Sequence, residues 1–406
     1  MDTRVQQRGV TRSPGARMAP AIVAMAVVCA AGTIVAGQGA PGAVPNLAGR
    51  ILTVLGPIAP DRLGSTLMHE HIFIDFQNPV TRAAISRATD LQLHLSKVGL
   101  DTLHDVRYRG IPNRDNLYLD DLQESIDEVM AFKLRGGGAI VDVSSIGLGR
   151  DPQALAQVSR ATGLDIVMGA GWYQKQFHPA DMSSRTVEQL TEVIVRDITQ
   201  GAEGTAIRSG IIGEVGIDGD PLTENELKSV RAAARASRIT GAAVTFHRGG
   251  VGEEKFRVLD AMAAEGADLR RVVMGHSNSI AVDVPFMKRL LDRGVFIQFD
   301  TLGRPRTALG GVDDFKVARG IAELVKLGYA DRITLSHDVC NKIHQKAYGG
   351  FGFSYISDHF LPMLEDLGVA KADIQKIMVE NPRRILTFVA PQPVPAAQTA
   401  RGAAPR

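Results

Sequence analysis

Apolar segments alternate with amphipathic ones along most of the chain, and this alternation predicts its elements. Helices are expected at 120–134, 187–198 and 224–240, because apolar residues recur on one face of each segment. Short apolar runs between such segments are typical of buried strands. The runs expected to form strands are the one leading into His69 and those at 139–143, 166–171, 210–215, 242–247, 272–276, 295–300 and 333–338.

Eight apolar strands separated by helices predict an α/β fold, a (β/α)8 TIM barrel that forms a single domain over residues 51–390. An apolar run at 51–55 ahead of the first long strand predicts an N-terminal β-hairpin. A doubly wound open sheet is the alternative, but no glycine-rich dinucleotide turn follows an early strand. Residues 76–118 lack clear periodicity and are expected to form an irregular excursion with short helices.

The two ends of the chain differ from this pattern. Residues 1–37 combine an arginine-bearing start with an apolar run at 19–35 and small residues at 36 and 37, which predicts a signal peptide. Residues 38–50 are expected to be a linker, and the Pro- and Ala-rich residues 391–406 a disordered tail. The protein is therefore expected to be exported to the periplasm or secreted, without a stable membrane anchor. Only Cys340 follows the predicted signal peptide, so no internal disulfide can form in the mature protein.

The net charge of the chain gives little information about its binding partners. The net charge of +2 arises in the first segment, where arginines outnumber acidic residues, and the rest of the 406-residue chain is nearly neutral. No basic cluster interleaved with aromatic residues is present, which argues against nucleic acid as a partner. A small-molecule substrate is expected, with the chain acting alone or as a homodimer.

Candidate metal ligands stand at the predicted strand ends. His69 and His71 are two residues apart on the first strand, so both imidazoles point the same way. Four further candidates end later strands, where barrel enzymes keep their catalytic groups. These are Glu214, His247, His276 and Asp338. A lone histidine there is often structural, and Asp338 could cap the next helix, but the six together predict a metal site.

Two metal ions fit this set better than one. Four histidines and two carboxylates exceed the three protein ligands that a single catalytic zinc uses, and a carboxylate can bridge two ions. Zinc is the expected metal, although these ligand types also suit manganese, cobalt or iron. A water shared by two cations would have a lowered pKa and could act as a nucleophile.

The motifs at 64–71, 140–144, 210–212, 275–277, 336–338 and 381–383 resemble the phosphotriesterase family of the amidohydrolase superfamily. The resemblance covers roughly residues 51–388. It implies that His69, His71 and Asp338 hold one metal ion, that His247 and His276 hold the other, and that a carboxylate of the fourth strand bridges them. It also implies a zinc-dependent hydrolase in which a metal-bridging hydroxide attacks the substrate and Asp338 carries the proton.

Two departures from the family pattern narrow the expected activity. The bridging group of the phosphotriesterases is a carboxylated lysine, but no lysine occurs between 175 and 228, so Glu214 must serve instead. Such a glutamate is similar to the phosphotriesterase-related branch, whose chemistry includes hydrolysis of N-acylated small acids. The relay histidine of the seventh strand is also missing, because Asp300 is followed by Thr301. Organophosphate hydrolysis is therefore expected to be inefficient.

Loops that follow the carboxyl ends of the strands are expected to determine substrate specificity. Trp172 and Tyr173 follow the third strand, and Arg304 follows the seventh, where its planar guanidinium could bind a carboxylate or sulfonate. The leading prediction is a hydrolase of a small amide or ester. The alternatives are a lactonase or organophosphate triester hydrolase and, from another class, a catalytically inactive, metal-stabilised binding protein.

Overall fold

The computed structural model describes residues 44–78, 85, 87–304 and 312–392. The predicted signal peptide, the start of the predicted linker and nearly all of the predicted tail lie outside these residues. No helix within the described ranges has both the length and the apolar character to span a bilayer.

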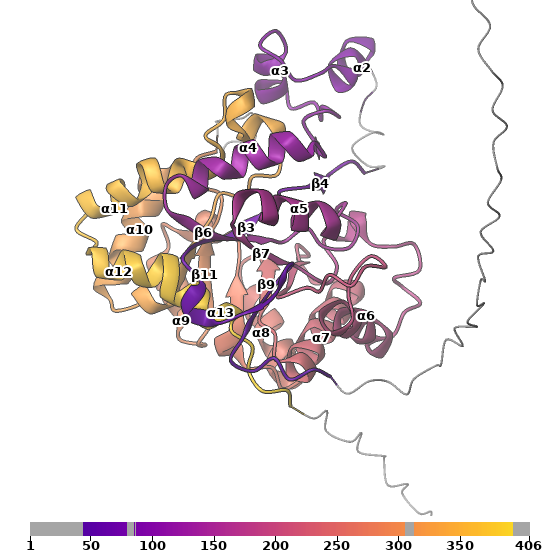
Figure 1. Cartoon of the computed structure of the whole chain (residues 1–406), viewed down its shortest axis with the longest axis vertical. Coiled ribbons are helices and arrows are strands. Elements are labelled where there is room, and N and C mark those ends of the chain that lie inside the picture. Colours follow the sequence, from indigo (N-terminus) through magenta and orange to yellow (C-terminus); the bar gives the residue numbers. More distant parts are fainter. Residues whose placement is uncertain (1–43, 79–84, 86, 305–311, 393–406) are drawn as a thin grey trace, which may run out of the picture. The chain divides into compact units, whose positions relative to one another are not determined.

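Two groups of parallel strands form the centre of the fold (Figure 1). One group has the order β12-β11-β10-β9-β8 and the other the order β3-β6-β7. Backbone hydrogen bonds join the groups on both sides, from the Gly210 N–H to the Met168 oxygen and from the Asp338 N–H to the His69 oxygen. The strands are β3 (Ser65–Glu70), β6 (Gly137–Asp142), β7 (Asp165–Met168), β8 (Ile212–Gly216), β9 (Val244–His247), β10 (Val272–Met274), β11 (Phe296–Phe299) and β12 (Ile333–Leu335). The predicted TIM barrel is confirmed.

Helices follow the barrel strands and cover their outer side (Figure 1). Their ends have identifiable chemical causes: Thr223 forms a capping box with Glu226 at the start of α7, and Gly241 ends that helix at φ 79°. The helices are α4 (Leu122–Lys133), α5 (Pro152–Thr162), α6 (Val187–Thr199), α7 (Glu224–Thr240), α8 (Glu254–Ala264), α9 (Val284–Leu291), α10 (Asp314–Lys326), α11 (Leu361–Asp366), α12 (Lys371–Gln375) and α13 (Asn381–Leu386).

The N-terminal hairpin is also confirmed, with β1 (Ile51–Thr53) pairing antiparallel with β2 (Gly56–Ile58). Gly56 and Pro57 lie within β2, and Val54 and Leu55 form the turn. The residues that precede the hairpin contact the barrel, because Leu47 is buried and the Gly49 N–H donates to the Phe388 oxygen.

The predicted excursion at 76–118 contains α2 (Ala88–Leu95), α3 (Leu103–Tyr108) and β5 (Tyr118–Leu119), which pairs with β4 (Ile74–Asp75). The two helices stand at the top of Figure 1. Leu93 and Val106 pack with Ile343 from the segment after β12 in a small core of their own. The excursion thus lies at the end of the barrel to which the strands deliver their carboxyl termini.

Neighbouring residues of a strand enter different cores, as the alternation of side chains requires. On β6, Ile140 joins the large core that includes helix residues such as Val129 and Leu155. Val141 joins a second core made mainly of strand residues, including Val273 and Phe296. Both faces of the strands are therefore buried, which explains why their sequences are continuously apolar.

Candidate metal centre

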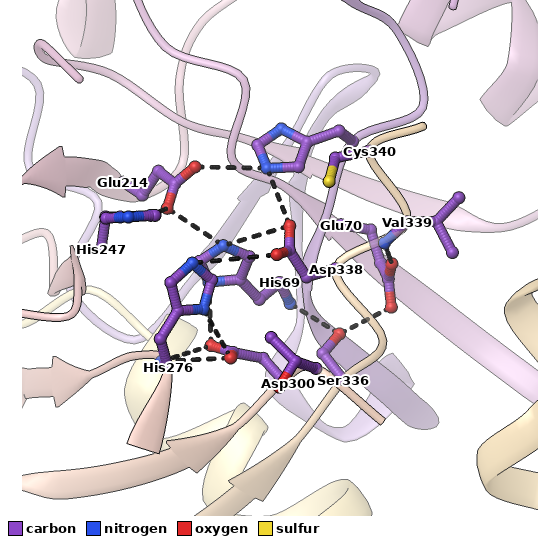
Figure 2. A network of polar contacts seen from close by, with 12 residues as sticks. His69, Glu70, Glu214, His247, His276, Asp300, Ser336, Asp338, Val339 and Cys340 are labelled. Atoms are coloured by element: carbon purple, nitrogen blue, oxygen red, sulfur yellow. Dashed lines mark hydrogen bonds and ion pairs between the residues drawn. The ribbon is translucent and has the colours of Figure 1, made fainter. Parts of the chain in front are cut away.

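All six predicted metal ligands meet at the carboxyl ends of the strands. Figure 2 labels all of them except His71. His69 lies on β3 with His71 just beyond it, and Asp338 follows β12. Glu214 lies on β8, His247 ends β9 and His276 follows β10. Their side chains are buried or nearly so, with His276 the most exposed at 11%. The fold thus gathers residues that are as far as 269 positions apart in the sequence into one cluster.

The ligand atoms form three overlapping groups in which all candidate atoms lie within 4.8 Å of one another. One group contains His69, His71 and Glu214, and another contains Glu214, His247 and His276. The third group joins His69 and His276 to Asp338. Glu214 is therefore the carboxylate that the two histidine pairs share. Its Oε1 lies 3.2 Å from His71 Nε2, and its Oε2 lies 3.1 Å from both His69 Nε2 and His247 Nδ1.

Neighbouring side chains fix the orientation of the imidazoles. The Ser144 hydroxyl donates to the Phe73 oxygen at 2.7 Å, so it can only accept from His71 Nδ1, which lies 2.9 Å away. In neutral His71, the form that binds a metal, this tautomer leaves the Nε2 lone pair facing the cluster. The Asp300 carboxylate likewise accepts from His276 Nδ1 at 2.7 Å. Such partners are typical of metal-binding histidines.

Asp300 is a functional candidate that the sequence analysis did not identify as part of the site. It is fully buried, and its carboxylate lies 3.3 Å from His69 Nδ1 in addition to its contact with His276. Gln298, also buried, places its Oε1 3.2 Å from the same His69 nitrogen. Asp300 stands one residue beyond β11, and this shared position at a strand end was the signal that could have identified it.

Electrostatics in the cluster favour bound positive charge. Burial alone would lower the pKa of His69, but the carboxylates of Glu214, Asp300 and Asp338 outweigh that effect and raise it to about 10. Burial likewise opposes the charge of His71, yet hydrogen bonds to Asp338 and Glu214 raise its pKa to about 9. Burial would raise the pKa of Glu214, but His69 and His247 hold it well below its usual range.

Two ligands lie in backbone conformations that L residues seldom adopt. His276 has φ 48° and Asp338 has φ 54°. Left-handed backbone costs of order 1–3 kcal/mol at a non-glycine residue and concentrates at functional sites. The fold therefore holds these two side chains against a local backbone preference.

The predicted substrate residues do not all reach the cluster. The Tyr173 hydroxyl lies 3.0 Å from His247 Nδ1, so its ring borders the site. The Arg304 guanidinium donates to the Asp338 backbone oxygen at 2.8 Å and also contacts the Asp338 carboxylate, while its side chain remains 31% exposed. Trp172 is buried in the large core and lines a different cavity of about 800 Å³, together with Arg150 and Asp197. Its indole is not brought to the ligand cluster.

The donors present fit divalent cations. Every candidate atom is an imidazole nitrogen or a carboxylate oxygen, which are ligands for zinc and related metals. His69 Nε2 is buried, and its 3.1 Å contact with Glu214 Oε2 lacks hydrogen-bond geometry, so this nitrogen forms no hydrogen bond within the part of the chain that the structure describes. A buried polar atom without such a partner is rare, and a cation at this point would satisfy it.

Comparison with known proteins agrees with this geometry. The sequence matches the phosphotriesterase family over residues 49–386. The chain belongs to the phosphotriesterase family. It is 35% identical over 355 residues to an N-acetyltaurine hydrolase of Xenopus tropicalis, and the alignment covers 84% of this chain and 99% of that protein. The human N-acetyltaurine hydrolase is 34% identical over the same shares of the two chains.

Solved structures that are similar to this chain share its fold. A resiniferatoxin-binding protein from Rhodobacter sphaeroides is similar with a TM-score of 0.77 and 38% identity, covering 83% of this chain and 95% of that chain. A lactonase from Listeria monocytogenes is similar with a TM-score of 0.70 and 27% identity, covering 84% and 99%. The family and the named relatives make this chain a phosphotriesterase-family hydrolase.

Proposed function

We propose that this protein is a dinuclear, zinc-dependent hydrolase that cleaves the amide bond of a small N-acylated acid. The observation that carries the proposal is the place of Glu214, which belongs to two of the three groups of ligand atoms, with His69 and His71 in one and with His247 and His276 in the other. A single shared carboxylate between two histidine pairs is the arrangement that a bridging ligand requires. His69, His71 and Asp338 would hold one ion, and His247 and His276 the other.

Two divalent cations bound here would supply Lewis-acid activation of a water molecule and of the substrate carbonyl. The protein's own part in the reaction is positioning and proton transfer. Asp338, whose Oδ1 lies 3.2 Å from His71 Nε2, accepts the proton from the attacking water and passes it to the leaving group. Burial raises the pKa of Asp338, but Arg304 and the neighbouring histidines lower it far more, so the carboxylate is ionised in the metal-free protein.

The anionic part of the substrate is assigned to Arg304. Its guanidinium reaches the cluster at Asp338 yet keeps part of its surface exposed, so a carboxylate or sulfonate could approach it. Tyr173 borders the cluster at His247. An anion-binding arginine beside the metal centre suits an N-acyl amino acid or aminosulfonate, and the relatives named N-acetyltaurine hydrolase support this class.

Lactone hydrolysis is the second candidate activity, because solved family members at 27% identity are named lactonases. The amide is preferred, because the N-acetyltaurine hydrolases have higher identity over almost their whole length. The protein is further proposed to be exported, to act without nucleic acid or a membrane anchor, and to function alone or as a homodimer.

A substrate panel on metal-replete protein tests the activity. We expect N-acyl amino acids and aminosulfonates to be hydrolysed faster than lactones, and organophosphate triesters slowest. Elemental analysis of the same preparation should find close to two zinc ions per chain, since two ions are proposed. A folded protein with only trace metal would contradict the dinuclear site, and full metal content without hydrolysis of any panel member would favour a binding protein.

A further inference from the structure

Glu70 lies between two metal-ligand candidates in the sequence, yet its carboxylate lies away from the cluster, next to Ser336 and Val339 (Figure 2). The side chain is fully buried and accepts hydrogen bonds from four donors. Its Oε1 accepts from the Ser336 hydroxyl at 2.8 Å, from the His337 N–H at 2.8 Å and from His337 Nδ1 at 2.9 Å. Its Oε2 accepts from the Val339 N–H at 2.9 Å.

These donors stand on both sides of Asp338 in the sequence. Asp338 itself has φ 54°, a conformation that a non-glycine residue holds only when its surroundings impose it. Glu70 binds the backbone N–H groups of the residues before and after it, His337 and Val339. The carboxylate therefore fixes the turn from which the Asp338 side chain enters the metal cluster.

The same carboxylate is connected to the first histidine ligand. The Ser336 hydroxyl donates to Glu70 and accepts from the His69 N–H at 2.9 Å. His337 Nε2 accepts from the Ile356 N–H at 3.1 Å, so the proton of a neutral His337 resides on Nδ1 and points to Glu70. Every hydrogen-bond partner found for the Glu70 carboxylate in the described part of the chain is thus a donor.

We propose that Glu70 is a positioning residue for Asp338 in the reaction proposed above, on which this inference rests. A carboxylate is needed rather than an amide, because all four contacts require an acceptor. An amide at this position would direct its NH₂ group at a donor, either the Val339 N–H or the donors at Oε1. The donors that face this NH₂ group would then lose their hydrogen-bond acceptor. Asp338 would be free to relax from its left-handed conformation.

The test compares Glu70→Gln with Asp197→Asn, a control that removes a buried charge elsewhere. Asp197 is buried and pairs with Arg150 at 2.8 Å, in a cluster separate from the metal ligands. For each variant we would measure zinc affinity of the metal-free protein, the urea midpoint of unfolding, kcat and KM. Glu70→Gln is expected to weaken zinc binding and lower kcat by about 10- to 100-fold each, the range for partners that orient metal ligands, with KM nearly unchanged.

Asp197→Asn is expected to lower the unfolding midpoint while kcat and zinc affinity stay at wild-type values. If Glu70→Gln loses only stability, as the control does, its role is structural and the positioning proposal is overturned. A crystal structure of zinc-loaded Glu70→Gln that retains φ near 54° at Asp338 would also overturn it. Zinc affinity reports on positioning even if no panel substrate is cleaved, so failure of the proposed function would be recognised separately.

A second variant covers the case in which Glu70→Gln does not fold. Ser336→Ala removes one of the four donors together with the contact to the His69 N–H. The remaining donors still hold Glu70, so the protein should fold and bind zinc more weakly by about 3- to 10-fold, below the range for losing the acceptor itself. Unchanged zinc affinity in Ser336→Ala would contradict the proposed connection between Glu70 and the ligands.

Discussion

The bridging role of Glu214 is the residue-level claim on which the two-metal site depends. Glu214→Gln keeps one coordinating oxygen but removes the negative charge that both histidine pairs share. We therefore expect metal content and turnover to fall together, with loss of at least one ion per chain, because a neutral amide is a poor bridge. Elemental analysis and kcat measured on the same sample check this.

Asp197→Asn is again the matched control, since it removes a buried carboxylate outside the metal cluster. It should retain wild-type metal content. Glu214→Lys offers a further check, because a lysine here could be carboxylated and should recover activity only with added bicarbonate. Wild-type metal content and turnover in Glu214→Gln would place the bridge elsewhere.

Asp338 is assigned both metal binding and proton transfer, and one substitution separates the two roles. Asp338→Asn preserves the size and one coordinating oxygen but cannot accept a proton. We expect turnover to fall by roughly a hundredfold or more, the usual scale for losing a general base, with most of the metal retained. The acidic limb of the pH–rate profile should also disappear, because that limb would report deprotonation of the metal-bound water and its carboxylate partner as a coupled unit. Near-normal turnover with both ions bound would leave Asp338 as a ligand only.

At the scale of elements, close backbone contact between neighbouring strands positions the ligands. Gly169 follows β7, and a Cβ added there would overlap the backbone oxygen of Gly213 on β8, the residue before Glu214. Neither backbone can move without disturbing the barrel. Gly169→Ala should therefore destabilise the protein by about 3 kcal/mol and reduce metal binding, because overpacking forces β8 to shift.

Urea unfolding and zinc titration of Gly169→Ala measure these effects. Gly99→Ala is the control, because its added Cβ would meet only the flexible Asp101 carboxylate at 3.0 Å. That variant should keep the stability and zinc affinity of the wild type. An equal effect of both substitutions would show that the β7–β8 contact has no special part in positioning Glu214.

Local pattern was enough to predict the barrel strands, the hairpin and the helices that follow the strands. It worked because each barrel strand is buried on both faces and so is continuously apolar. The excursion at 76–118 was harder to predict. Its small core depends on Ile343, a residue more than two hundred positions away that no local pattern can supply.

The candidate site likewise contains features that local sequence pattern predicts and features that depend on residues distant in sequence. The convergence of the candidate ligands could be predicted, because they all stand at strand ends and because metals require a few residue types. The roles of Glu70 and Gln298 could not, since they arise from hydrogen bonds between strands distant in sequence. Trp172 and Tyr173 are neighbours in sequence, yet the structure directs the first to the core and the second to His247. Side-chain direction after a strand depends on backbone detail that sequence spacing does not reveal.

At the scale of the whole molecule, the N-terminal segment predicts the cellular compartment in which the protein acts. Residues 1–37 have the composition of a signal peptide, so the mature protein should begin near Gln38 and fractionate with the periplasm of a bacterial host. Terminal sequencing of the purified protein checks this. Soluble cytoplasmic protein that retains residues 1–37 would contradict export, and a lipid on Cys29 would contradict the absence of an anchor.

The stability of the whole metal-free protein should depend on pH through His344, which follows β12. His344 is buried and accepts a hydrogen bond from the Cys340 N–H at 3.3 Å. Burial, with the nearby charge of Arg304, lowers its pKa from 6.5 to about 3. The folded protein therefore keeps His344 neutral at a pH where the unfolded chain takes up a proton. Its contribution to stability is complete above pH 6.5 and is lost as the pH falls toward 3.

Between pH 7.5 and pH 5.0, this one group should reduce the free energy of unfolding by about 2 kcal/mol. His344→Asn places an oxygen near the position of Nδ1 but cannot be protonated, so it should remove that part of the pH dependence. Urea unfolding of the chelator-treated proteins at both pH values measures this change in the free energy of unfolding. Subtracting the change found for the variant from that found for the wild type removes the contributions of the other titrating groups. His104→Asn, at an exposed histidine, is the control and should behave as the wild type. If His344→Asn loses as much stability on acidification as the wild type, His344 is not held neutral in the folded protein.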